Sequence, residues 1–260
     1  MPQPFPHPLA AKVPEITLLF WVIKVLTTGM GETASDYLAH TSLALAGLIG
    51  VGGLAVALGW QLSTTEYRPA AYWTAVAMVA VTGTMVADAL HRFVGLSYAV
   101  TTPFYAAVLT AVLVWWWLSE RTLSIHSIHT RRREAFYWLA VMASFALGTA
   151  AGDFTAATLN LGYFTSGLLF GAMILVPLVA WRLGLNAVVA FWAAYILTRP
   201  LGASFADWLG KPAYRSGLGY GDGTVTVVTL LAIVVLVAWV AATGHGVQAR
   251  REPEFETEPA

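Results

Sequence analysis

Apolar residues form eight stretches along the chain, each long enough to cross a hydrocarbon layer of about 30 Å as a helix. Helices are expected because an open strand would leave unpaired backbone groups in lipid. The predicted spans are residues 16–36, 38–60, 70–90, 97–118, 135–157, 162–181, 186–208 and 222–243. The pattern therefore predicts an all-α, polytopic membrane protein with eight transmembrane helices.

The odd-numbered spans share three features at fixed spacing. Each opens with an aromatic pair, namely Phe20-Trp21, Tyr72-Trp73, Tyr137-Trp138 and Phe191-Trp192. A glycine follows each tryptophan by ten residues, and an aspartate follows each glycine by five. These residues are Gly31, Gly83, Gly148 and Gly202, and Asp36, Asp88, Asp153 and Asp207. Four of the chain's five aspartates at one offset indicate internal duplication.

Each duplicated unit contains two spans, so all four units enter the membrane in the same direction, as parallel repeats. We place the repeats at residues 16–67, 68–119, 135–182 and 183–243. An arginine-rich cytoplasmic linker, 120–134, separates the second repeat from the third. Residues 1–15 form an N-terminal cytoplasmic segment, and the charged tail, 244–260, is expected to be disordered. Four helical hairpins would form a ring or a pseudo-twofold arrangement, with the odd helices facing a shared axis.

Four tandem two-span repeats, each with a characteristic tryptophan, resemble a bacterial membrane-protein family known as a "repeat of unknown function". The opening "KVPEITLLFWVIKVLTTGMGETASDYL" is similar to the first repeat of that family. The resemblance covers about residues 16–243 and implies an eight-span protein of the bacterial inner membrane. It implies no activity, so function has to be argued from the residues.

Composition supports a lipid environment and sets the orientation. The chain is 58% hydrophobic and 11% charged, whereas soluble domains are near a quarter charged. Nine lysines and arginines lie on the side of the chain ends and three on the opposite side, which places both termini in the cytoplasm. The net charge is zero, so nucleic acid is not an expected partner. A homo-oligomer is compatible with the sequence, which does not fix the oligomeric state.

One stripe of each odd helix carries the functional candidates. The position eleven residues after the tryptophan is Glu32, Thr84, Thr149 or Ala203, and the aspartate lies one turn further on the same face. Intramembrane charges are a default hypothesis of function. The predicted ion-binding residues are Glu32, Asp36, Asp88, Asp153, Asp207, Lys24 and Arg199.

Structural roles compete with this interpretation. The aspartates could instead cap the helices that follow, and the glycines could serve only close helix packing. The tryptophans are expected to be anchors at the membrane interface. Lys24 and Arg199 could pair with repeat carboxylates to hold the bundle together; for Lys24, we expect Glu32 at long reach, or Asp153 or Asp207 from another helix.

A divalent ion such as Mn²⁺ or Zn²⁺ is one form of such a site, and no other cofactor is indicated. The candidate metal ligands are Glu32, Asp36, His40, Asp88 and His91, since the histidines follow their aspartates at helical spacing.

The leading hypothesis is a proton-linked transporter of a small cation, with the lipid bilayer and the cation or proton as its partners. A cation channel is the first alternative, and a non-catalytic membrane partner or sensor is another. A membrane enzyme acting on a lipid head group would use aspartate and histidine as acid and base. No nucleophile lies beside a base in the sequence, so we do not expect an enzyme.

Overall fold

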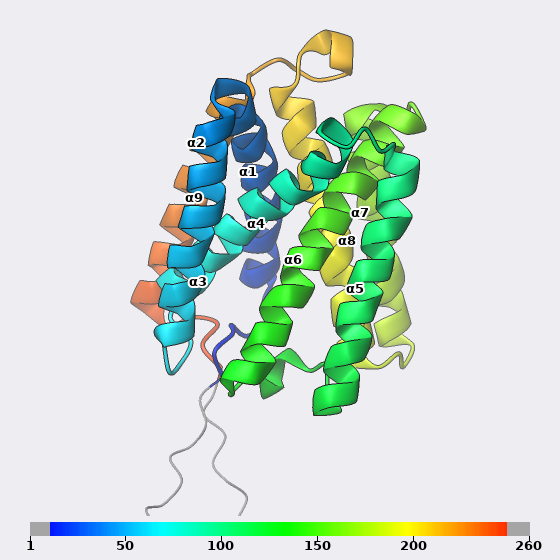
Figure 1. Cartoon of the computed structure of the whole chain (residues 1–260). Coiled ribbons are helices and arrows are strands. Elements are labelled where there is room, and N and C mark those ends of the chain that lie inside the picture. The colour runs from blue at the N-terminus through cyan, green and yellow to red at the C-terminus, as the bar shows by residue number, and fades with distance from the viewer. Residues whose placement is uncertain (1–10, 249–260) are drawn as a thin grey trace, which may run out of the picture.

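The computed structural model describes residues 11–248, and every regular element in that range is a helix (Figure 1). The principal helices are α1 (Leu18–Thr41), α2 (Leu43–Gly47), α3 (Gly53–Ser63), α4 (Pro69–Arg92), α5 (Tyr98–Glu120), α6 (Arg131–Asp153), α7 (Gly162–Arg182), α8 (Ala187–Gly210) and α9 (Asp222–Thr243). Two π-helical turns interrupt the regular geometry. η1 (Leu48–Gly52) joins α2 to α3, so the second predicted span is not one continuous α-helix, and η3 (Phe154–Thr158) extends α6.

Seven helices in the described part are long and apolar enough to cross a membrane, as expected of a multi-pass membrane protein. They begin at Leu43 and Pro69, and then at Tyr98, Arg131, Gly162, Ala187 and Asp222. α1 is not among them, since its charged residues Lys24, Glu32 and Asp36 make it less apolar. All three of these residues are buried. The eight-span count stays a prediction, although α1 coincides with the first predicted span.

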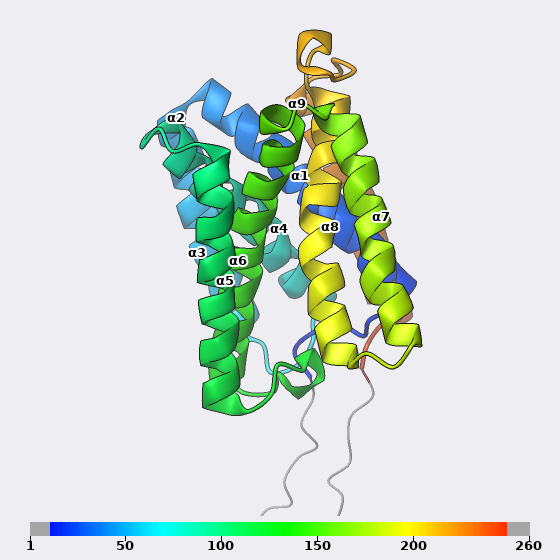
Figure 2. The same cartoon turned by 90° about the vertical axis from the view of Figure 1, so that its right-hand side faces the viewer.

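Four helices, one from each repeat, form an inner ring. α1 packs against α4, α4 against α6, α6 against α8, and α8 against α1 (Figures 1 and 2). In an apolar 18-residue stretch of α4, 67% of the residues are buried, whereas 22% are buried in the corresponding stretch of α5. The inner helices are therefore covered by protein, and the outer helices present their apolar side chains to lipid. We call the line through the centre of this ring the pseudo-fourfold axis.

Each outer helix packs on the inner helix of the next repeat. α3 contacts α4, α5 contacts α6, and α7 contacts α8; α9, the last helix, contacts α1, the first. Contact between α4 and α5 within the second repeat is slight by comparison. The hairpins are therefore not self-contained, because the apolar face of each outer helix is buried against the inner helix of the next repeat.

The repeat glycines lie where adjacent inner helices touch. A Cβ atom on Gly31 would overlap Ala80 of α4, and one on Gly83 would overlap Phe145 of α6. The other two contacts repeat this geometry: Gly148 meets Arg199, and Gly202 meets Thr28. In each case the residue that the glycine contacts lies three positions before the glycine of the next repeat. The glycines therefore set the close approach of the ring helices.

The aromatic pairs form a closed belt around one end of the axis. The first ring of each pair lies beside the tryptophan of the next repeat, with centroid separations of 5.8 Å for Phe20–Trp73, 5.6 Å for Tyr72–Trp138, 6.3 Å for Tyr137–Trp192 and 5.8 Å for Phe191–Trp21. Trp73, Trp138 and Trp192 are buried. These three are thus core residues, and the prediction that they anchor the chain in the membrane interface was wrong. Hydropathy does not distinguish a tryptophan buried in protein from one at the lipid boundary.

Both ends of the described chain lie at this belt end (Figure 1). The amide of Glu15 donates to the carbonyl of Gly246 at 2.8 Å. Residues 244–248, which we expected to begin a disordered tail, are therefore ordered against the N-terminal segment. The rest of that tail lies outside the described residues.

Candidate functional site

The inner face of each ring helix is a stripe of residues four apart. In α1 the stripe is Lys24, Thr28, Glu32 and Asp36, and the stripes of the other repeats align with it. Residues at the same position in the four helices form layers across the axis. The layer of Thr28, Ala80, Phe145 and Arg199 is followed by that of Glu32, Thr84, Thr149 and Ala203, and then by the four repeat aspartates.

Arg199 belongs to the first of these layers, but its guanidinium extends along the axis into the second. Its Nη2 atom lies 2.6 Å from Oε2 of Glu32 and 2.6 Å from Oγ1 of Thr149, and it also donates to Oγ1 of Thr84. Both threonine hydroxyls are 3.4 Å from the same Glu32 oxygen. The arginine of the fourth repeat therefore meets one oxygen-bearing side chain from each of the other three. Arg199 and Glu32 are both buried, so the pair is shielded from solvent.

Lys24 does not have the partner that its sequence suggested. Its ammonium has no hydrogen bond or ion pair in the described part of the chain, although the side chain is only 1% exposed. Instead, Nζ lies 4.2 Å from the ring centroids of both Phe145 and Tyr195. The predicted pairing with Glu32, Asp153 or Asp207 was wrong, because Arg199 already occupies Glu32 and the aspartates lie further along the axis. Cation–π contacts compensate only part of the cost of burying this ammonium.

Two basic residues hold the aspartate layer. Nη2 of Arg92 lies 2.7 Å from Asp36 and 3.0 Å from Asp88. Lys211 forms an ion pair with Asp36 as well, and its Nζ lies 2.9 Å from Asp222 and 3.6 Å from Asp207. Asp36 is thus shared between the second and the fourth repeat.

Asp153 differs from the other aspartates because it has no ion pair among the described residues, where the phenol of Tyr98 lies beside it. None of the four repeat aspartates caps the next helix. Those helices begin after Ser42, Ser97, Leu161 and Gly221. The capping alternative was therefore wrong: three of the aspartates are held by ion pairs within the layer, and Asp153 lies against Tyr98.

Arg92, Lys211 and Asp222 were not among the predicted site residues. The available signal was their spacing, because Arg92 and Lys211 each follow a repeat aspartate by four residues and so continue the inner stripe. Lys211 lies just beyond α8. Its burial alone would lower its pKa, but the carboxylates of Asp207, Asp36 and Asp222 outweigh that effect and raise the pKa of Lys211 above its usual value.

Three carboxylates in the described chain are close enough to share one ion. Ligand atoms of Glu32, Asp36 and Asp207 all lie within 4.8 Å of one another, and all three residues are buried. Of the predicted metal ligands, the structure brings Glu32 and Asp36 into this group and leaves Asp88, His40 and His91 outside it. An all-oxygen set suits a hard cation such as Mn²⁺ or Mg²⁺ better than Zn²⁺.

His40 and His91 each form a hydrogen bond between a ring nitrogen and a backbone carbonyl nearby in the sequence. Nδ1 of His40 lies 2.7 Å from the carbonyl oxygen of Asp36, and Nδ1 of His91 lies 2.8 Å from that of Leu96. The His91 ring also stacks on Tyr98, with the centroids 4.0 Å apart. Each contact helps to end a helix or shape the turn that follows it.

Two pockets border the aspartate layer, at the end of the molecule opposite the belt. A pocket of about 470 Å³ is lined by Asp88 and Arg92, between α1, α2 and α4. A second pocket, of about 310 Å³, is lined by Lys211 and Asp222. In the other direction, Arg199 and the aromatic belt fill the axis.

A ring of parallel helical repeats with paired charges at its centre defines a multi-pass membrane protein with internal fourfold duplication. The chain belongs to the family described as "Repeat of Unknown Function (DUF347)", whose model matches residues 19–67, 71–122, 136–183 and 190–245, well over half of the sequence. Comparison with curated proteins gives no match, and comparison with solved structures gives none either.

Proposed function

We propose that this protein is an integral membrane transporter of a small cation, coupled to protons, with its substrate site in the aspartate layer. The residues that would carry it are Glu32, Asp36, Asp88, Asp153 and Asp207, with the paired guanidinium of Arg199 and the unpaired amine of Lys24 further along the axis. No catalytic step and no resident cofactor are part of the proposal.

The single observation that carries the proposal is the charge imbalance of this layer. Five aspartates, the four of the repeats and Asp222, gather around two cations, Arg92 and Lys211, and four of the five pair with them in the described chain. Buried like charges repel one another strongly, because little water screens them. A proton or a metal ion bound among these carboxylates would relieve the repulsion, and a layer built only for stability would gain nothing from surplus acids.

Glu32 offers a means of coupling. Its carboxylate is bound to Arg199 on one side and lies within reach of Asp36 and Asp207 on the other. A cation held by Glu32, Asp36 and Asp207 would compete with Arg199 for the same carboxylate. Binding in the aspartate layer would therefore loosen the group that fills the axis, as alternating access requires.

Closure of the axis favours a transporter over a channel. A channel needs a continuous conducting path, whereas Arg199 and the aromatic belt fill the axis on one side of the aspartate layer. On the other side of Arg199, one pocket is lined by Asp88 and another by Lys211 and Asp222. A site open to one side is the arrangement expected of one state in an alternating cycle.

Uptake into vesicles tests the proposal directly. Purified protein is reconstituted, a pH gradient is imposed, and movement of Na⁺, Mn²⁺ and Mg²⁺ is measured separately. We expect gradient-driven flux of at least one of these ions, and its loss in the double variant Asp88→Asn with Asp153→Asn. Glu120→Gln is the matched control, since Glu120 pairs with Arg132 and Arg133 at the opposite end. Equal flux in wild type and the double variant would refute the assignment.

A further inference from the structure

Residues 11–17, which we call the N-terminal strap, cross the belt end of the ring as a non-helical segment. The carbonyl of Ala11 accepts from the amide of Tyr67 at 3.0 Å, and the amide of Lys12 donates to Ile128 at 3.1 Å. The side chain of Gln248 donates to the carbonyls of Val13 and Pro14. These partners lie between the first and second repeats, between the second and third, and after the fourth. One short segment thus ties together two of the connections between repeats and the segment that follows the fourth.

A buried ion pair fixes the strap in place. The ammonium of Lys12 pairs with the carboxylate of Glu134 at the start of α6, and both side chains are almost fully buried. Gln61 of α3 completes the network, donating to Glu134 at 2.9 Å and to the carbonyl of Lys12 at 3.3 Å. Loss of one member would leave an uncompensated charge in this site.

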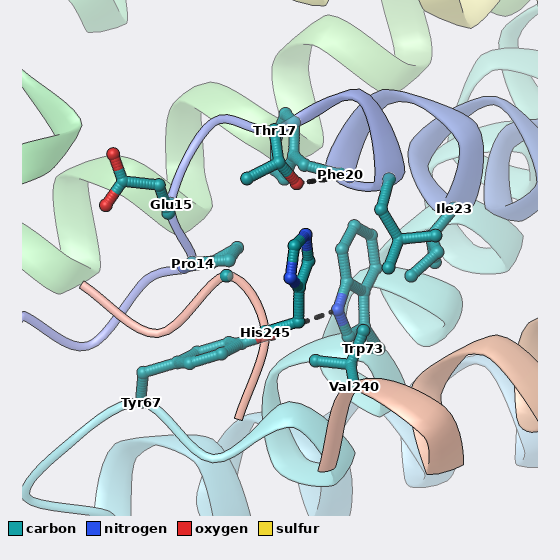
Figure 3. Close-up of a pocket in the computed structure, with 11 residues that line it drawn as sticks. Pro14, Glu15, Thr17, Phe20, Ile23, Tyr67, Trp73, Val240 and His245 are labelled. Carbon is teal, nitrogen blue, oxygen red and sulfur yellow. Dashed lines mark hydrogen bonds between the residues drawn. The ribbon is translucent and has the colours of Figure 1, made fainter. Parts of the chain in front are cut away.

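Beneath the strap is a cavity of about 10 Å³, the size of one water molecule. Figure 3 shows the residues that line it, which include Pro14 of the strap, Phe20 and Ile23 of α1, and Trp73 of the aromatic belt. His245 of the C-terminal segment closes it from the side. The strap therefore lies directly between solvent and the belt.

We propose that the N-terminal strap is a gate that closes the belt end of the axis, with the Lys12–Glu134 pair as its latch. Three features suit it to this role. The strap is non-helical, so it can move without breaking a helix. It continues directly into α1, whose inner stripe carries Lys24, Glu32 and Asp36, so displacement of the strap acts on the helix that holds the substrate carboxylates. Among the described residues its ion pair with the ring is that of Lys12 with Glu134, which a change in local charge would release. This regulatory role rests on the proposed transport, but its test does not require transport.

The chain contains no cysteine, so one introduced cysteine is a unique thiol. Ile23→Cys places it on α1 beneath the strap, at a position that is 1% exposed. A membrane-impermeant maleimide is added from the side of the chain ends, and the rate of labelling is measured. We expect slow labelling with the native strap. Lys12→Glu, which sets two carboxylates against each other, should raise the rate about a hundredfold.

Charge reversal and a matched control make the result specific. The double variant Lys12→Glu with Glu134→Lys restores the pair and should return labelling to the slow rate. Glu120→Gln removes a different glutamate ion pair at the same end and should leave labelling slow. Unchanged labelling in Lys12→Glu, or no recovery in the double variant, would overturn the gate. Failure of the vesicle flux experiment alone would instead refute the transport proposal and leave the gate standing.

A second thiol separates local opening from unfolding. Val79→Cys lies in α4 at a position with no exposed surface and away from the strap. It should stay unlabelled in every background. If it is labelled in Lys12→Glu, the milder Lys12→Met takes its place, and the same two outcomes at Ile23→Cys decide the question.

Discussion

Nη2 of Arg199 lies 2.6 Å from Oε2 of Glu32, which joins two residues 167 positions apart at the centre of the ring. The pair connects the fourth repeat to the first, and Thr84 and Thr149 bring in the second and the third. Because the first and fourth repeats supply opposite charges and the other two supply threonines, the duplicated units have become a single asymmetric core.

Loss of either partner in this pair should be costly. Glu32→Gln or Arg199→Met alone leaves an unpaired buried group, and we expect a loss of about 3–5 kcal/mol in unfolding free energy. Replacing both residues, as Glu32→Leu with Arg199→Met, should restore most of the stability. Thermal unfolding followed by tryptophan fluorescence gives the order of midpoints. A double variant no more stable than the single variants would show that the pair itself is not what the core requires.

Adding even one methyl group at a repeat glycine should lower the free energy of unfolding. Gly148→Ala and Gly202→Ala would place Cβ against Arg199 and Thr28, with an expected loss of about 1–3 kcal/mol from overpacking. Gly59→Ala in α3 is the matched control, since no atom lies within 4 Å of its Cβ position. There, the better helix propensity of alanine should stabilise slightly, by up to about 1 kcal/mol. Thermal unfolding midpoints that fall equally in all three variants would contradict this packing.

Metal binding at the three converging carboxylates should raise thermal stability. Mn²⁺ at about a hundred times its Kd would add about 2.7 kcal/mol to the folded state. Asp207→Asn removes one of the three ligands and should abolish the Mn²⁺-dependent rise in the unfolding midpoint, whereas Glu120→Gln should retain it. An identical rise in Asp207→Asn would place the ion elsewhere.

The contribution of Lys211 to stability should not change between about pH 7 and about pH 9. The folded-state pKa of Lys211 is raised above 10.5, so its stabilising effect is complete below the unfolded value and is lost only as the pH rises through the folded one. Lys211→Met should therefore lower the unfolding midpoint by similar amounts at both pH values. The measurement is the difference between wild type and variant at each pH, and a difference that disappears by about pH 9 would contradict the raised pKa.

Much of the fold could be predicted from the sequence because membrane helices are recognisable by their length and apolar composition. The offsets among tryptophan, glycine and aspartate revealed four equivalent helices, and the structure arranges them around one axis. The same offsets placed Glu32 and the aspartates on one inner face, where they lie. Periodicity therefore indicated which side of each helix turns inward.

What the sequence did not reveal depends on contacts between helices. Spacing along α1 cannot show that Arg199 of α8, rather than Lys24, reaches Glu32, because that depends on the order of helices in the ring. The buried tryptophans were misassigned for a related reason, since lipid and protein interiors are equally apolar. Packing of α9 on α1 also could not be predicted from a local sequence pattern, because these two helices lie near opposite ends of the chain.

The pairing of the first helix with the last two has a consequence for biogenesis. α1 precedes its partners in the chain: Asp36 can pair with Arg92 once α4 has been made, but Glu32 meets Arg199 only after α8, and Asp36 meets Lys211 only after that. The contacts that hold α1 in the ring are therefore complete only when the last part of the described chain has been made.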